Sequence, residues 1–281
     1  RRSLYVYYGK SGGAAPTAPS LSASATVQVI DPNGEVTSTG DTSPTDYIWG
    51  CDLEATYVDS GATGTYYGAG SSHKLGVTNA GRKYHMLVKP GEWALRKGTT
   101  SSAKLHLYVE TNNVGSGETL TIYTHKLKSY GVDDSNGTNR HEYWVKTGWT
   151  NQEAGAPTWN GRYINYNRDS SGATTTAWQT AGATGTNEID SSTHVDLALT
   201  GASGTGYKTI TLTSSWIDDW QGDTYSSGLL LKDSTDTGGT NDRHVVVTAQ
   251  GQANSPVMEI TYSSLSSDQL TARKLTSDTF S

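Results

Sequence analysis

Cysteine and phenylalanine are nearly absent from this sequence, which has one of each among its 281 residues. The single cysteine, Cys51, excludes an internal disulfide framework and a zinc site built from cysteines. Apolar runs are short as well, and residues 229–231 and 245–247 are strand-sized. They fall well below the roughly 20 apolar residues of a membrane-spanning helix, so we expect no membrane span.

Positive charge is also scarce. The chain has 21 Lys and Arg against 27 Asp and Glu, which gives a formal net charge of −6. Affinity for a phosphate backbone comes largely from Lys and Arg. The balance therefore argues against nucleic acid as a partner.

Helical periodicity is rare, because glycine, serine and threonine interrupt almost every candidate segment. The exception is residues 214–220, where Ser214 or Ser215 suits the N-cap and Trp216 and Trp220 share one helical face. Alternating runs bounded by turn-forming residues are abundant instead and predict strands. They fall at residues 3–8, 26–30, 104–109, 119–126, 207–213, 228–232, 244–249 and 257–262.

The alternation is clearest in residues 104–109. Leu105 and Leu107 point to one side of the predicted strand, while Lys104 and His106 point to the other. One face of this strand is expected to be buried and the other to be exposed to solvent. Many such strands, separated by turns and not by helices, predict an all-β fold, an antiparallel β-sandwich with jelly-roll-like connections.

Composition divides the chain into three parts. Residues 1–24 are an N-terminal strand followed by a small, polar, flexible arm. Residues 25–262 hold the dense strand pattern of the sandwich domain, and residues 263–281 form a polar connector. The first strand has no partner nearby in sequence, so we expect the arm to pair elsewhere, including with another subunit. The chain starts without Met, and we interpret it as a processed form or a fragment of a longer protein.

Several short motifs follow one another between residues 54 and 262. They include SSAKLHLYV at 101–109, GWTNQEAGAPTWNGRY at 148–163, TAWQTAGA at 176–183 and SPVMEITY at 255–262. In order and spacing this segment resembles the DNRLRE-type domain, a β-sandwich family also called disaggregatase-related and grouped with carbohydrate-binding modules. The resemblance implies an extracellular, non-catalytic module of the kind found in secreted microbial proteins and phage virion proteins.

An aromatic cluster lies in loop-like sequence rich in glycine, asparagine and threonine. Its members are Trp149, Trp159, Tyr163, Tyr166 and Trp178. In one interpretation the rings stack on sugar rings while Asn160 and Arg162 bond the hydroxyls, with Arg162 and Arg168 pairing with any sugar carboxylate. In the other, the three tryptophans, which the family motif retains, pin a long loop against the sandwich.

Two adjacent acids, Asp218 and Asp219, form no catalytic pair in our interpretation. Glycoside hydrolysis needs two carboxyl groups that face one bond across about 5 to 9.5 Å, whereas the side chains of adjacent residues diverge. We expect Asp218 to solubilise the helical turn or to accept a bond from a nearby backbone amide. The protein is accordingly predicted not to be an enzyme.

Two oxygen-rich loops are candidates for calcium, which takes about 6 to 8 oxygen ligands. One contains Asp133, Asp134 and Asn136, and the other contains Asp233, Asp236 and Asp242. The same residues are also ordinary turn formers. The seven histidines include no H-x-x-x-H pair, so zinc is not expected.

Together these features predict a non-catalytic module that binds a polysaccharide or glycan and serves adhesion. We expect it outside the cell, at a cell surface or on a virion. The alternative is a structural subunit of a phage virion or an extracellular filament, which self-associates through residues 1–20. No cofactor other than calcium is expected.

Overall fold

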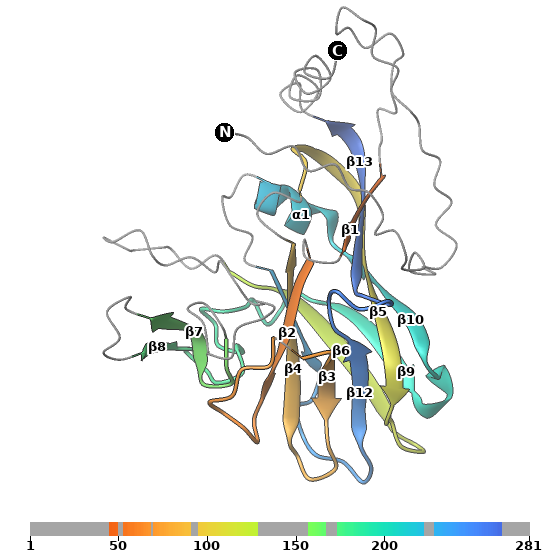
Figure 1. The fold of residues 1–281 in the computed structure, drawn as a ribbon. Coiled ribbons are helices and arrows are strands. Elements are labelled where there is room, and N and C mark those ends of the chain that lie inside the picture. Colours follow the sequence, from red (N-terminus) through yellow and green to blue (C-terminus); the bar gives the residue numbers. More distant parts are fainter. Residues whose placement is uncertain are drawn as a thin grey trace, which may run out of the picture.

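The computed structural model describes residues 45–49, 53–68, 70–90, 95–128, 157–166, 173–221 and 228–265. Within these ranges every strand pairs antiparallel with its neighbours. The prediction of an all-β antiparallel fold is therefore confirmed (Figure 1). The predicted strands at 3–8 and 26–30, and the arm over residues 1–24, lie outside the described residues.

The strands form two walls that are joined through hydrogen bonds. The first wall runs in the order β1 (Thr45–Trp49), β13 (Val257–Leu265), β5 (Gly98–Asn112) and β10 (Gly206–Leu212). The second runs in the order β2 (Leu53–Asp59), β4 (Lys83–Pro90), β11 (Leu229–Asp233), β6 (Thr119–Lys126) and β9 (Val195–Thr200). β12 (Arg243–Thr248) and β3 (Ser72–Val77) connect β5 to β4.

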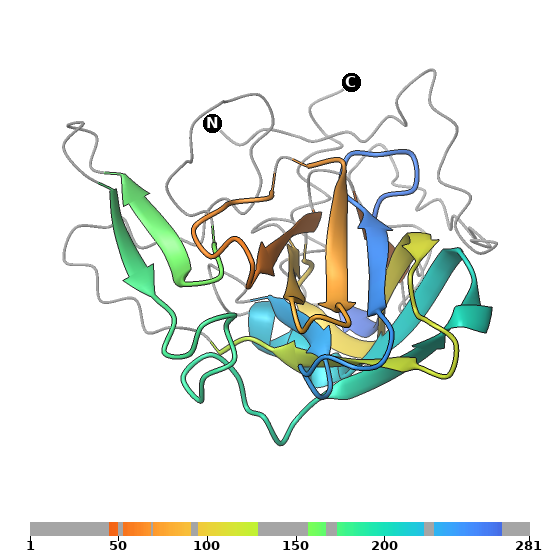
Figure 2. The same cartoon turned by 90° about the horizontal axis from the view of Figure 1, so that it is seen from below.

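Because the two walls are continuous, the sheet curls instead of forming two separate layers. β9 and β10 follow each other in sequence through the short helix η2 (Gly201–Ser203), and they contact each other. Figure 2 shows the curl from below. The fold is thus β-sandwich-like, with one curved sheet supplying both sides.

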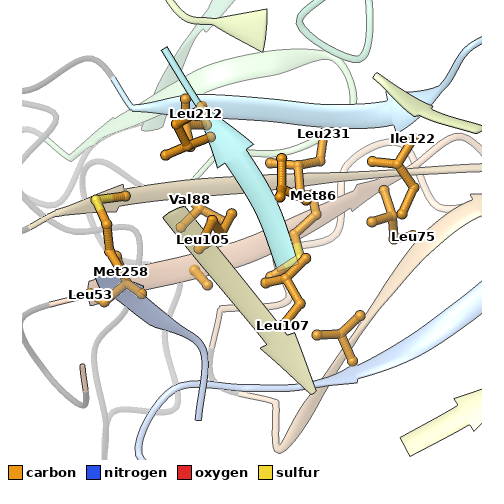
Figure 3. Packing of buried hydrophobic residues seen from close by; sticks show 14 of the residues in the cluster. Leu53, Leu75, Met86, Val88, Leu105, Leu107, Ile122, Leu212, Leu231 and Met258 are labelled. Carbon is orange, nitrogen blue, oxygen red and sulfur yellow. The ribbon is translucent and has the colours of Figure 1, made fainter. Parts of the chain in front are cut away.

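The core lies inside this curl. It is built from the inward residues of the strands in both walls and of β12 and β3, and Leu105, Leu107, Ile210 and Met258 are each at most 2% exposed. Figure 3 shows Leu105, Leu107 and Met258 meeting side chains from other strands in one cluster. The dry side of the alternation in β5 is therefore the side that faces the core.

The helix α1 (Ser214–Gln221) confirms the one helical turn expected from the sequence. It packs on β5 and places Trp216, Ile217 and Trp220 in the core. Figure 1 shows α1 at the upper end of the sheet. No helix in the part of the chain that the structure describes is long and apolar enough to cross a membrane.

A second, smaller core lies on the outside of the second wall. The second wall contributes Val58, Leu87 and Leu230 to it. They are buried against side chains that follow β6 in the sequence. Those side chains belong to Leu127, Trp159, Trp178, Ala183 and Ile189. The segment that contains the small strands β7 (Gly161–Tyr166) and β8 (Ala173–Ala177) thus packs on the outer face of the sheet.

Candidate functional site

The outer face of the first wall carries a set of polar and aromatic side chains, here called the tyrosine face. Strand register places them on one side of the first wall, opposite to the side that carries core residues such as Leu105, Leu107 and Ile260. The tyrosine face consists of Tyr47, Lys104, His106, Tyr108, Tyr207, Thr209 and Glu259.

Strand register brings these residues into rows. Tyr47 of β1 lies opposite Glu259 of β13, which in turn lies opposite Lys104 of β5. Further along β5, Tyr108 lies opposite Tyr207 of β10. Residues far apart in sequence therefore share one surface across four strands.

Glu259 is the electrostatic centre of the tyrosine face. Its Oε1 accepts from Lys104 Nζ at 2.8 Å, and its Oε2 lies 3.0 Å from His106 Nε2. The other ring nitrogen of His106 lies 3.0 Å from the hydroxyl of Thr209. Burial raises the pKa of Glu259, but the bonds from Lys104 and His106 outweigh it and hold the pKa below its ordinary value. Glu259 is therefore a fixed carboxylate at neutral pH.

Three half-buried tyrosines belong to the same face: Tyr47 lies opposite Glu259, whereas Tyr108 and Tyr207 lie four residues further along β5. Tyr108 and Tyr207 pack edge to face with ring centroids 5.2 Å apart. Burial raises the pKa of Tyr207, with a further contribution from Tyr108, and burial followed by the charge of Glu259 raises the pKa of Tyr47. Both phenols therefore stay neutral, and that of Tyr207 donates to the carbonyl of Ser255 at 3.4 Å and can still accept a hydrogen bond.

Such a surface is suited to recognition. Half-exposed tyrosine rings offer an apolar body and a polar tip to a ligand that is itself part apolar and part hydroxylated. A carboxylate held by two partners keeps its place when a ligand arrives.

The structure corrects the sugar-platform interpretation for two of the predicted residues. Trp159 is 8% exposed and Trp178 is 6% exposed, and both belong to the second core. The indole Nε1 of Trp178 donates to the carbonyl of Thr158 at 2.8 Å, so its one polar group is already used. These rings pin the segment to the sheet, as the other interpretation proposed, because neither offers an open face to a sugar.

The remaining platform residues are placed only in part. Asn160 is exposed, and its backbone bonds Thr63 and Trp178. Arg162, Tyr163 and Tyr166 lie in β7, but their side chains are outside the described residues, as is Trp149.

The calcium loop at residues 233–242 is also corrected. Asp233 accepts from Arg243 Nε at 3.1 Å and from the backbone and hydroxyl of Thr235. Asp236 is bound by His85 at 3.0 Å and by Lys232 at 3.0 Å. The carboxylates bind cationic side chains of the protein itself, so they are not free to converge on calcium.

Asp242 has a separate structural bond, since its Oδ1 accepts from the backbone amide of Asn79 at 2.8 Å. In the described ranges no three His, Cys, Asp or Glu residues gather as a metal site would require. The other calcium candidates, Asp133, Asp134 and Asn136, lie outside the described residues.

Asp218 and Asp219 diverge as expected. Asp218 Oδ1 accepts from the backbone amide of Thr100 at 2.8 Å, whereas Asp219 pairs with Lys126. The expectation that Asp218 bonds a backbone amide is confirmed.

The sequence alone places three residues of the tyrosine face on one side of a strand, but it does not show that they form part of a larger surface. The wet side of residues 104–109 already contained Lys104, His106 and Tyr108, but their partners lie on strands distant in sequence. Only the register of β1, β13 and β10 against β5 brings Glu259 and the other tyrosines beside them.

Comparison with known proteins adds no identity. No family model matches the chain, and no curated protein matches it.

Proposed function

We propose that this protein is a non-catalytic module that binds carbohydrate on the tyrosine face. The observation that carries the proposal is the presence of three half-exposed tyrosines on the same outer sheet face as a fixed carboxylate. The sequence resemblance to DNRLRE-type domains supports the same class of function and an extracellular, cell-surface or virion location.

The dimensions of the tyrosine face favour an extended chain over a single sugar. Tyr47 and Tyr108 are two strands apart, and the Lys104 that shares a row with Tyr47 is four residues from Tyr108. Standard strand spacing and rise then separate their backbones by about 17 Å. A ligand that touches both rings must span several sugar units.

Binding without catalysis is supported by the state of Glu259. A glycosidase needs a protonated acid beside the bond that it cleaves, and such an acid has a raised pKa. The pKa of Glu259 is instead held low by Lys104 and His106. Its role in this proposal is to accept hydrogen bonds from sugar hydroxyls and to fix its neighbours.

The test is a glycan array with the whole chain, followed by calorimetric titration of any oligosaccharide that binds. Truncating Tyr108 or Tyr207 to Ala should weaken binding by about tenfold or more, since aromatic anchors dominate such surfaces. Tyr123→Ala is the matched control, because Tyr123 is also half-buried but lies on the second wall. An array without a binder, or equal affinities for all three variants, would refute the proposal.

A second candidate function is a structural subunit of a virion or filament. It is favoured by β1, which has β13 as its only strand neighbour among the described residues. An open strand edge can accept a strand from another chain, and residues 3–8 have the alternation to supply one. Deleting residues 1–20 should then abolish self-association in sedimentation experiments, and unchanged assembly would exclude this role for the arm.

A further inference from the structure

Two histidines distant in sequence meet on the outer face of the second wall. His125 lies in β6, and His194 immediately precedes β9, its antiparallel neighbour. Their ring centroids are 5.5 Å apart, with the ring planes tilted by 55°. The tyrosine face is on the other wall, so this pair belongs to a different surface.

His125 has one nitrogen engaged and one free within the part of the chain that the structure describes. The side chain is buried, with the residue 2% exposed. Its Nδ1 lies 3.2 Å from the carbonyl of Thr193, which can only accept, so Nδ1 carries the proton. The buried Nε2 has no hydrogen-bond partner and presents a lone pair.

The neutral form of His125 is favoured by its surroundings. Burial lowers its pKa, and the charges of Lys232 and His194 lower it further, against the main-chain carbonyls of Thr193 and Asp190. The Nδ1–H that points to the carbonyl of Thr193 leaves Nε2 as the ring nitrogen with the lone pair, which is the form that a metal ligand needs.

His194 is held in a fixed orientation by Tyr123. The two rings stack with centroids 3.8 Å apart and planes 24° from parallel. Its Nδ1 is buried and, like Nε2 of His125, has no hydrogen-bond partner among the described residues. Two unpartnered ring nitrogens thus lie on neighbouring, oriented rings.

This arrangement has the features of a metal-binding histidine pair. A ligating histidine usually donates its second ring N–H to a carbonyl or carboxylate, which fixes the tautomer, and His125 does so to Thr193. Zinc–nitrogen bonds of about 2.0 to 2.1 Å at a tetrahedral angle would place the two ring centres about 5 Å apart. The observed separation is 5.5 Å.

The charge of Lys232, which acts on His125, is paired with groups of the protein itself. Lys232 lies opposite Tyr123 in the sheet, but its ammonium is bound to Asp236 Oδ2 at 3.0 Å and to the carbonyl of Asp233 at 2.8 Å. On the other side, Asp196 is exposed and lies opposite Tyr123 across the β6–β9 pair. The ammonium of Lys232 is therefore already bound to a carboxylate, and a second carboxylate lies across the strand pair.

We propose that His125 Nε2 and His194 Nδ1 bind one divalent transition metal ion of the zinc, copper or nickel class. The described residues offer no third His, Cys, Asp or Glu at this place, so water or an oxygen of a bound ligand completes the coordination. Imidazole nitrogen selects these metals over calcium and magnesium, which prefer oxygen.

The test is calorimetric titration of the chelator-treated whole chain with zinc chloride, followed by electron paramagnetic resonance of the copper(II) form. We expect one saturable zinc site per chain and a copper spectrum with nitrogen ligands. His125→Gln and His194→Gln should each weaken zinc binding by at least about tenfold. Binding should also weaken as pH falls, because protons compete for the imidazoles.

His244→Gln is the matched control. His244 also has a buried Nδ1 without a partner and a pKa lowered by burial, but it lies in β12. It should leave zinc affinity unchanged. Absence of a saturable site for zinc, copper and nickel, or full affinity in His194→Gln, would overturn the proposal. Because His194 is half-exposed, that variant keeps the test decisive if His125→Gln fails to fold.

Discussion

Gly76 shows how one residue can be required by a close approach of two strands. It lies in β3 with a φ of 118°, a conformation that side chains with a Cβ rarely adopt. A Cβ added there would lie 2.2 Å from the carbonyl oxygen of Arg243 in β12. Strain and overlap therefore coincide at the point where the two walls join.

We expect Gly76→Ala to lower the free energy of unfolding by about 3 kcal/mol or more, combining backbone strain with overpacking. Gly251→Ala is the control, because Gly251 also has a positive φ, 77°, but a Cβ there would meet nothing within 4 Å. It should cost about 1 kcal/mol. Urea unfolding of both variants measures the difference, and equal losses would show that the approach of β12 does not matter.

His106 illustrates what alternation says about a single residue. The pattern correctly put it on the side away from the core, but that side was expected to be wet. The residue is 5% exposed, because Glu259 and Thr209 lie against its ring from the neighbouring strands. Strand alternation predicts to which side of the sheet a side chain points, whereas the side chains on neighbouring strands decide how far it is buried.

At the scale of elements, α1 is tied to the start of β5 by two side chains. Asp218 accepts from the amide of Thr100, and Gln221 Oε1 accepts from the amide of Gly98 at 2.7 Å. These bonds satisfy backbone donors of the strand and orient the helix that fills the end of the core.

Asp218→Ala should therefore lower the free energy of unfolding by about 1 to 2 kcal/mol, since it leaves the amide of Thr100 without its acceptor. The adjacent Asp219→Ala should change it by less than about 0.5 kcal/mol, because the Asp219 side chain is 62% exposed and its pair with Lys126 is at the surface. Thermal or urea unfolding compares the two variants. A larger loss for Asp219→Ala would contradict this account of how α1 is held.

Two of the strands that the sequence patterns missed are buried on both faces. β6, β10, β11, β12 and β13 match predicted runs to within a few residues. β2 and β4 were missed because they are buried almost continuously, with the core on one side and the second core on the other. Burial of both faces removes the alternation by which a strand is recognised.

At the scale of the whole molecule, the free energy of unfolding should fall in two steps as the pH is lowered. His73 is fully buried, and burial lowers its pKa to about 4 from the ordinary 6.5. Between these values the unfolded chain binds a proton that the folded chain does not. The free energy of unfolding should therefore fall by about 3 kcal/mol as pH decreases from 6.5 to 4.

Asp236 should cause the second step. Burial raises its pKa, but His85 and Lys232 outweigh burial and lower the pKa to about 2 from 3.8. Its stabilisation is present above the unfolded value and is lost as pH falls from 3.8 to 2, by about 2 kcal/mol. Urea unfolding against pH should show a shallower slope in His73→Gln above pH 4 and in Asp236→Asn below it. Profiles parallel to the unmodified chain would contradict these assignments.

The sequence by itself determined the kind of structure: alternating runs, turn residues and scarce helical periodicity leave an antiparallel β protein with one helical turn. It also determined which side of β5 faces the core, because side-chain direction is a local property of a strand. Only the tertiary structure decided which side chains are buried and which lie together on one surface. Trp178 became a core residue, Glu259 joined Lys104 and His106, and His194 reached His125, because strand register joins residues that no sequence spacing relates.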